Sequence, residues 1–204
     1  MISMYIGSGD VAALMSGKAT KGHQSLLRRF VSGEKPYYNA FASPIDACRI
    51  GAILEGRYLL TLPDSYYPQY VVESKEMNVF KCSLDFARLE SGKVIDFDEL
   101  KSISFNDFML LEQLKREGGN IIAYVKSNYK HYYQQVQEQL YCTGLDSANL
   151  VFLPVYSYVD EENYNRNILE NEIFKIRIGY DSEFVESMKI RGSIFQQIKD
   201  YYET

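Results

Sequence analysis

The sequence has few cysteines and lacks tryptophan altogether. Its three cysteines, Cys48, Cys82 and Cys142, are widely spaced and form no C-x-x-C pair. This pattern offers neither a disulfide framework, a structural zinc site nor a four-cysteine iron–sulfur cluster. All three have apolar neighbours along the chain, which predicts buried free thiols in a reducing compartment.

Long apolar runs and an export signal are also missing. No window holds 18 consecutive apolar residues. The N-terminal residues MISMYIGSGD lack the basic start and the apolar stretch of a signal peptide. We therefore expect a soluble, unexported protein with no membrane partner.

A surplus of positive charge is the third absence. The chain has 22 Lys and Arg residues against 27 Asp and Glu residues, which gives a formal net charge of −5. Because proteins that coat nucleic acid are usually basic, this balance excludes a broadly cationic DNA-coating surface. A role on nucleic acid would have to rest on a local site.

The sequence does contain enough apolar material for one substantial core. Its 204 residues are 46% hydrophobic and 24% charged, as in ordinary globular domains. It has no internal repeat, low-complexity tract or Ser/Pro-rich linker, so we expect a single domain over residues 1–204.

Hydrophobic periodicity predicts helices near both ends of the chain and strands between them. The expected helices span 9–16, 23–31, part of 39–60, about 105–117, about 128–142 and about 182–202. The expected strands span 69–74, 78–89, 92–104, about 149–158 and about 172–179. This order favours an α+β fold with a mostly antiparallel sheet over a regular βαβ (α/β) alternation.

One predicted hairpin carries a pair of acids. A three-residue loop over residues 90–92 would place Asp85 opposite Phe97. Asp85 then becomes a diagonal neighbour of Glu99, with the two Cα atoms roughly 7–8 Å apart. Two uncompensated acids at that distance favour a hard divalent cation with oxygen ligands.

The last strand of this hairpin presents two different faces. One face carries Val94, Asp96, Asp98 and Leu100, and the other carries Ile95, Phe97, Glu99 and Lys101. The second face begins apolar and ends in an acid and a base, which indicates a core-facing surface that opens into a polar pocket. There Lys101 could help deprotonate a metal-bound water or stabilise a phosphorane-like transition state. The alternative is a surface Glu/Lys pair, with Asp85 in an ordinary polar contact.

Five short segments follow one another along the chain: IGSGDVAALM, GAILEGRYL, CSLD, ELK and YYQQVQEQLY. In content and order they resemble the phage lambda-type exonuclease family, also called YqaJ-like viral recombinases, of the PD-(D/E)XK nuclease superfamily. The resemblance covers about residues 6–155. It implies a restriction-endonuclease-like core, with a mixed, mostly antiparallel sheet flanked by helices.

The resemblance also implies roles for individual residues. Asp85, Glu99 and the Leu100 backbone carbonyl would bind metal, and Glu55 would approach it directly or through water. Lys101 would assist the attacking water, and Gln135 would contact the scissile or terminal phosphate. The remaining implied DNA- or phosphate-binding residues are Ser83, Ser8, Tyr132, Arg28 and, if the register is off by two, Gln137.

Taken alone, several of these residues favour a plainer interpretation. Glu55 is typical of a satisfied or exposed helix acid, and Gln135 and Gln139 share a helical face typical of polar packing. Only their joint occurrence with the D…E-x-K pattern reverses that interpretation.

Two departures from the family pattern concern the 5′-phosphate. The family's N-terminal serine falls on Gly9, which leaves Ser8 as a substitute, and its upstream arginine corresponds to a position near Ile2. The charge could come from the following helix, whose basic residues otherwise form a solvated face. These candidates are Lys18, Lys21, Arg28 and Arg29.

The activity implied by the resemblance is that of a Mg²⁺-dependent deoxyribonuclease. It would be a 5′→3′ exonuclease on linear duplex DNA ends, using two Mg²⁺ ions that Mn²⁺ can replace. It would serve phage-type recombination or DNA processing in the cytoplasm of a bacterial or phage-infected host cell. A single-strand annealing protein and a ring-shaped homotrimer are implied partners. The alternatives are an endonuclease on the same core, a catalytically silent DNA-binding or interaction module, and a purely structural protein.

Overall fold

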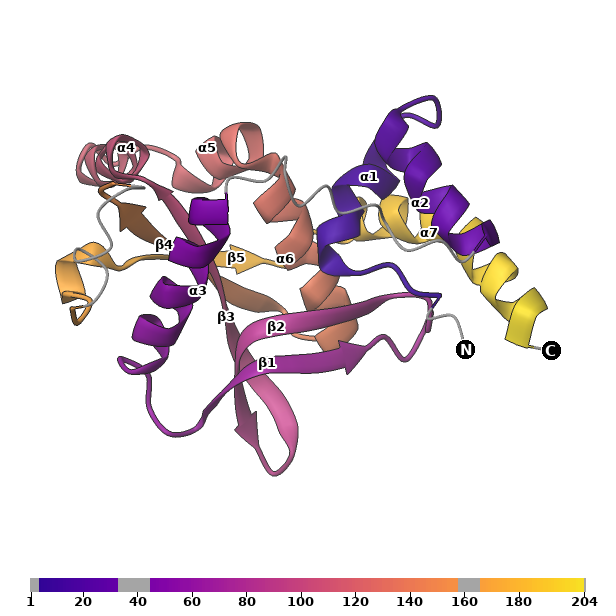
Figure 1. Ribbon diagram of the computed structural model, residues 1–204, viewed down its shortest axis with the longest axis horizontal. Coiled ribbons are helices and arrows are strands. Elements are labelled where there is room, and N and C mark those ends of the chain that lie inside the picture. The colour runs from indigo at the N-terminus through magenta and orange to yellow at the C-terminus, as the bar shows by residue number, and fades with distance from the viewer. Residues whose placement is uncertain (1–3, 33–44, 158–165, 204) are drawn as a thin grey trace.

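The computed structural model describes residues 4–32, 45–157 and 166–203. A five-stranded mixed sheet is flanked by helices, which confirms the expected α+β fold (Figure 1). In chain order the elements are η1 (Ser8–Asp10), α1 (Val11–Met15), α2 (Lys21–Ser32), α3 (Ile45–Leu59), β1 (Tyr66–Glu73), β2 (Lys81–Glu90), β3 (Lys93–Ser104), α4 (Phe105–Arg116), α5 (Ile121–Asn128), α6 (Lys130–Thr143), β4 (Ser147–Val155), η3 (Glu170–Glu172), β5 (Phe174–Gly179) and α7 (Ser182–Glu203).

The sheet follows chain order, β1-β2-β3-β4-β5. Three of its four neighbouring pairs are antiparallel, and β3 with β4 is the parallel one. A parallel pair needs a long crossover connection. Here α4, α5 and α6 provide it, which places α6 against the sheet.

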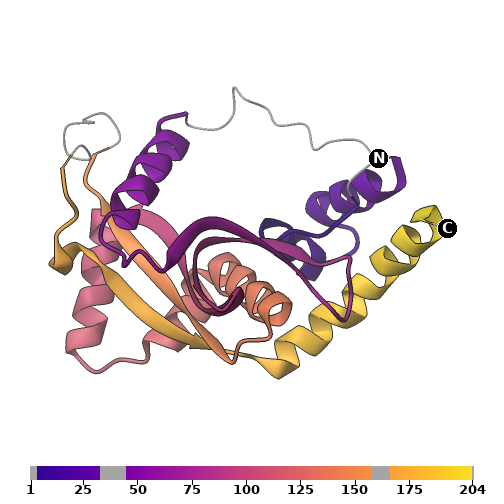
Figure 2. The same cartoon turned by 90° about the horizontal axis from the view of Figure 1, so that it is seen from below.

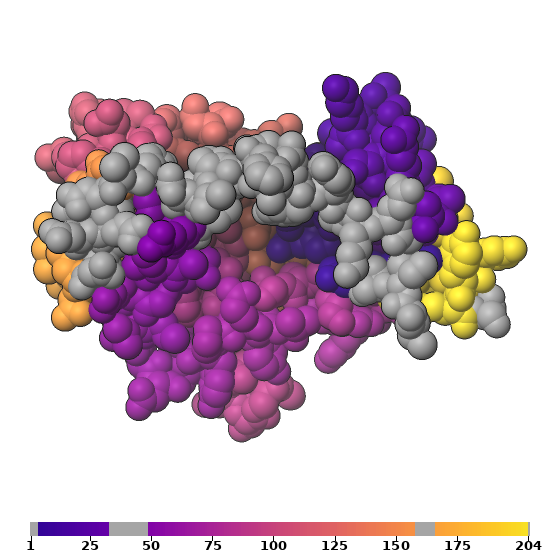
Figure 3. Space-filling model, viewed as in Figure 1, coloured from indigo at the N-terminus to yellow at the C-terminus, as the bar shows by residue number. Residues whose placement is uncertain are grey.

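Two buried clusters lie on the two faces of the sheet. On one face Leu54 and Tyr58 of α3 pack against Phe86 and Leu100. On the other face α6 joins a larger core that α1, α2 and α7 extend. Helices α2 and α7 lie side by side at one end of the molecule, in indigo and yellow (Figures 1 and 2). In Figure 3 the indigo N-terminal segment and the yellow C-terminal segment are neighbours on the face shown.

The β2–β3 turn is tighter than predicted. Glu90 pairs directly with Lys93, so the loop has two residues rather than three. Ser91 and Gly92 both have positive φ, 51° and 75°, which is the conformation that a two-residue hairpin needs to match the strand twist. Ser91 adopts the left-handed conformation because a two-residue turn matches the twist of the two strands better than a three-residue turn would.

The register of this hairpin also differs from the prediction. Leu89 pairs with Val94, whereas Arg88 pairs with Asp96, so a β-bulge leaves Ile95 without a partner. Val94 consequently packs on the larger core, and the prediction that it shares a face with Asp98 was wrong. Ala87, not Asp85, stands opposite Phe97.

The crossover contains three helices where the sequence predicted two. The unpredicted helix is α5, which begins after Asn120; the side-chain oxygen of Asn120 accepts the backbone N–H of Ala123 at 2.9 Å. This N-cap starts a new helix directly after the Gly118–Gly119 break. None of the described helices is both long and apolar enough to cross a membrane.

The remaining boundaries shift by a few residues. The segment predicted as a helix over 9–16 begins with the 3₁₀ turn η1, and residues 170–172 form η3 immediately before β5. The second strand begins at residue 81 rather than 78, and the fourth runs from 147 to 155. Residues 39–44 and 158 of the predicted elements lie outside the described residues.

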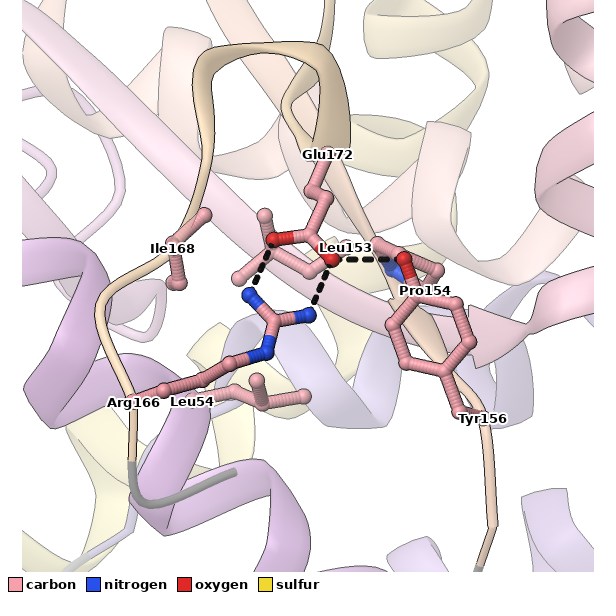
Figure 4. Close-up of a pocket in the computed structure, with 7 residues that line it drawn as sticks. All are labelled: Leu54, Leu153, Pro154, Tyr156, Arg166, Ile168 and Glu172. Carbon is pink, nitrogen blue, oxygen red and sulfur yellow. Dashed lines mark hydrogen bonds and ion pairs between the residues drawn. The ribbon is translucent and has the colours of Figure 1, made fainter. Parts of the chain in front are cut away.

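Buried Glu172, in the segment before β5, is hydrogen-bonded to Tyr156 at the end of β4 and to Arg166. Glu172 binds the Arg166 guanidinium through both carboxylate oxygens and accepts the hydroxyl of Tyr156 (Figure 4). These bonds to Arg166 and Tyr156 hold the pKa of Glu172 down at about 2. Tyr156, Arg166 and Glu172 line a cavity with a volume of only about 20 Å³. These residues therefore have a structural role and do not form a substrate site.

Candidate functional site

Strands β2 and β3 separate where the predicted acids lie. Their pairing ends at Phe86 with Asp98; beyond that point β2 stays with β1, and β3 stays with β4. At this fork the Asp85 carboxylate accepts the backbone N–H of Leu100 at 2.9 Å. Because the N–H and C=O of one strand residue point to the same side, the Leu100 carbonyl also faces the fork.

Glu99 is the centre of the site and is completely buried. Its Oε1 atom accepts hydrogen bonds from Lys101 Nζ and Gln135 Nε2, both at 2.6 Å. Its Oε2 atom accepts one from Gln139 Nε2, also at 2.6 Å. Three donors therefore hold the carboxylate in one orientation, and about one of its four lone-pair positions is left for another ligand.

Lys101 remains charged in this cluster. Burial alone would lower its pKa, but the carboxylates of Glu99 and Asp85 outweigh burial and raise the pKa above its ordinary value. The ammonium nitrogen lies 5.5 Å from the centre of the Tyr132 ring, which gives it an aromatic neighbour as well. The site thus holds a fixed cation beside buried Glu99 and half-buried Asp85.

The acids of the fork repel one another. Burial, followed by the charge of Glu99, raises the pKa of Asp85 to about 8, against the opposing effects of Lys101 and of the Leu100 N–H. Burial raises the pKa of Glu55 as well, while Lys101 lowers it and Glu99 raises it. Carboxylate and carbonyl oxygens are the donor set that Mg²⁺ and Mn²⁺ prefer. A divalent cation would relieve this repulsion, so the residues fit such an ion.

Glu55 of α3 lies within electrostatic reach of Lys101 and Glu99. One turn further along α3, the Tyr58 hydroxyl donates to Asp98 Oδ2 at 2.6 Å. Asp98 is fully buried and also accepts Lys175 Nζ at 2.8 Å and Asn149 Nδ2 at 2.7 Å. This network fixes α3 to the sheet, on the side of β3 opposite to Glu99.

Ser8 lies beside the cluster, whereas the hydroxyl of Ser83 is turned away from it. The amide nitrogen of Gln135 is 3.4 Å from the hydroxyl oxygen of nearly buried Ser8, which brings the N-terminal turn next to Glu99. Ser83 instead donates its hydroxyl to Gln69 of β1 at 3.1 Å.

Two of the predicted phosphate-binding residues are not brought to the cluster. Gln137 is fully buried; it donates to the carbonyl of Gly179 at 2.8 Å and accepts the N–H of Asp181 at 2.7 Å, so it supports the β5–α7 junction. Arg28 is exposed, and within the described residues it makes no contact with Glu99 or Asp85. Its neighbour Arg29 forms an ion pair with Asp10 at 2.6 Å.

Gln139 is the residue whose role the sequence reasoning missed. It is buried and donates both to Glu99 Oε2 and to the Ser83 carbonyl, the latter at 3.1 Å. The available signal was its i, i+4 spacing from Gln135, which places both amides on one face of α6. The distance from that face to Glu99 could not be known from the spacing.

Replacing Gln139 with leucine is expected to lower the free energy of unfolding by about 2–3 kcal/mol, because a buried carboxylate oxygen loses its donor. Urea denaturation of the metal-free protein measures the change. Gln134→Leu is the matched control, since Gln134 is a buried glutamine of the same helix and is not among the α6 donors that bind Glu99 in the described structure. An equal loss in both variants would contradict the role assigned to Gln139.

Comparisons with known proteins find structural relatives only. No family model matches the chain, and no curated protein matches it. The alkaline exonuclease LHK-Exo from Laribacter hongkongensis is 18% identical, with a TM-score of 0.58 over 98% of this chain and 90% of that one. The same exonuclease in complex with dAMP gives a TM-score of 0.56 at the same identity and coverage. A phage-related exonuclease from Haemophilus somnus 129PT is 13% identical, with a TM-score of 0.58 over 97% of this chain and 94% of that one. Over nearly its whole length the chain therefore has the fold of these exonucleases, as its resemblance to the lambda-type family implied.

Proposed function

We propose that this protein is a divalent-metal-dependent deoxyribonuclease that hydrolyses phosphodiester bonds from the ends of linear duplex DNA in the 5′→3′ direction. The observation that carries the proposal is the fork between β2 and β3. There buried Glu99, half-buried Asp85, a backbone carbonyl and a charged lysine lie together in a fold shared with exonucleases.

In this proposal Asp85, Glu99, the Leu100 carbonyl and Glu55 hold Mg²⁺, in the two-ion arrangement common in nucleases. When bound, such ions supply positive charge to the phosphate and a water of lowered pKa. They also supply the local positive charge that an acidic chain otherwise lacks. The carboxylate repulsion described above is the structural support for this assignment.

Lys101 acts as a hydrogen-bond donor in the proposed reaction. Because the neighbouring carboxylates keep its pKa raised, its ammonium group remains protonated and is not itself a base. It can orient the attacking water or stabilise the negative charge that develops on the phosphate oxygens. Gln135 uses its amide on the same side of Glu99, where one of its donors can turn to a phosphate oxygen.

DNA is the proposed substrate for two reasons. The structural neighbours are exonucleases, and LHK-Exo has been crystallised with dAMP. The N-terminal turn with Ser8 also lies next to Gln135, which is where the family resemblance places phosphate contacts. The annealing partner, the ring trimer, the cytoplasmic location and a role in phage-type recombination remain predictions of that resemblance.

The proposal is tested by digesting linear duplexes with 5′-phosphate or 5′-hydroxyl ends, labelled at either end, beside covalently closed circular DNA. We expect Mg²⁺-dependent release of nucleotides from the 5′ ends, none from the closed circle, and no release in EDTA. Cleavage of the circle would favour the endonuclease alternative. Binding without cleavage would favour a silent module, and release from 3′ ends would overturn the direction.

A further inference from the structure

A second cluster of ligand-type side chains lies between β2 and α6, separated from the fork by Gln139. Cys82 of β2 and Glu138 and Cys142 of α6 are all buried. One ligand atom from each lies within 4.8 Å of the other two. The Cys142 thiol is 3.2 Å from Glu138 Oε1. The proposed nuclease reaction uses none of these three groups.

The Glu138 side chain points to a missing ligand. It is fully buried, and its second oxygen, Oε2, has no hydrogen-bond partner within the part of the chain that the structure describes. An unpaired buried carboxyl oxygen costs about 1–3 kcal/mol, so such groups are normally satisfied. Two thiols beside it are the wrong partners for this purpose, since S–H is a weak donor.

We propose that Cys82, Glu138 and Cys142 form a binding site for a thiophilic divalent cation of the Zn²⁺ class. Zn²⁺ binds cysteine sulfur and carboxylate oxygen at about 2.0–2.3 Å in a tetrahedral arrangement. Ligand atoms around such an ion are then separated by about 3.5–3.8 Å. The three ligand atoms, all within 4.8 Å of one another, need only small side-chain movements to reach this spacing.

A surface cavity adjoins one member of the cluster. Cys142 lines a surface cavity of about 430 Å³ together with Ser74, Tyr141 and Tyr180. An ion can enter from this side, and a water molecule from the cavity can complete the four ligands. Thiol and carboxyl protons leave as the ion binds, because the ligands bind as anions.

A bound ion would fasten α6 to β2. Between this cluster and the fork, Gln139 already bridges Glu99 to the carbonyl of Ser83, the residue after Cys82. The ion would hold the same two elements together through Glu138 and Cys142, which lie just before Gln139 and about one turn beyond it on α6. We therefore expect it to stabilise the fold independently of DNA and of Mg²⁺.

The test is a titration of the reduced, metal-free protein with Cd²⁺, whose thiolate complexes absorb in the ultraviolet. We expect the absorption to saturate at one Cd²⁺ per chain and the melting temperature to rise with Cd²⁺ or Zn²⁺. Cys82→Ser and Cys142→Ser should each abolish both effects. Glu138→Gln should weaken Cd²⁺ binding by at least about tenfold. Circular dichroism checks that each variant is folded.

Two controls separate this site from other ligands. Cys48→Ser removes the third thiol and should leave the titration unchanged, and Asp85→Asn removes an acid of the fork and should keep the thiolate absorption. Absence of the absorption in the wild-type protein, or its persistence in both Cys82→Ser and Cys142→Ser, would overturn the proposal. If the serine variants fail to fold, an unchanged Cd²⁺ affinity in Glu138→Gln would overturn it instead.

Discussion

Replacing Lys101 with alanine should reduce Mg²⁺-dependent DNA cleavage by about 10²–10⁴-fold while the chain stays folded. The physical reason is the position of the ammonium group, 2.6 Å from Glu99 Oε1 and within the electrostatic reach of Asp85. Without it, neither the attacking water nor the developing phosphate charge has a fixed cationic donor from the protein. The measurement is the initial rate of nucleotide release from a labelled linear duplex, with circular dichroism as the test of folding.

Lys175→Ala is the matched control for this experiment. Lys175 also pairs with a buried acid of β3, since its Nζ atom lies 2.8 Å from Asp98 Oδ2. That pair lies on the opposite face of β3 and is not part of the fork. Because Tyr58 and Asn149 still bind Asp98 and hold α3 in place, we expect Lys175→Ala to keep the cleavage rate within a few-fold of the wild type. The role assigned to Lys101 would be contradicted if Lys101→Ala cleaved DNA at the wild-type rate, or if both variants lost the same fraction of the cleavage rate.

The second large effect concerns Asp85 in the absence of metal. Its pKa is raised to about 8 in the folded protein, against an ordinary value of 3.8. Between these values the folded chain holds a proton that the unfolded chain has released, so stability falls as pH rises from about 4 to about 8. We expect a decrease on the order of a few kcal/mol in EDTA, and a much flatter curve for Asp85→Asn in urea denaturation at several pH values.

Part of the decrease in the free energy of unfolding with rising pH should remain in the Asp85→Asn variant. Burial raises the pKa of Glu138 to about 8 as well, so Glu138 contributes a loss of stability in the same direction over the same pH range. The variant Glu138→Gln should remove this remaining pH dependence of stability.

The second half of the experiment adds Mg²⁺ at neutral pH. The ion should raise the melting temperature of the wild-type protein but not that of Asp85→Asn. Identical pH curves for wild type and Asp85→Asn would refute the assignment.

Local patterns predicted the elements of the site well. The alternation along β3 placed Phe97, Glu99 and Lys101 on one face, and the structure has Phe97 in the larger core and Glu99 bonded to α6 on that side. The helical period likewise placed Gln135 and Gln139 together. Both results follow because the direction of a side chain within one strand or helix depends only on the local backbone period.

Relations between elements were predicted less well. The turn at Ser91 and Gly92 is one residue shorter than expected, and the bulge at Ile95 moved the register so that Ala87 faces Phe97. A turn type and a bulge depend on small differences in twist and packing that a hydrophobic pattern does not carry. Asp85 reaches β3 through its bond to the N–H of Leu100, the residue after Glu99, and not through the predicted pairing.

The sequence by itself determined the α+β class, the face of β3 that carries the acid and the lysine, and the set of residues that the exonuclease resemblance selects. Only the tertiary structure decided that β2 and β3 separate at Asp85, that Gln139 holds Glu99, and that Cys82 meets Glu138 and Cys142. Side-chain periods are local and can be counted along a chain. Convergence of residues from distant elements depends on strand register and on how helices pack against the sheet, and these are settled by the whole core at once.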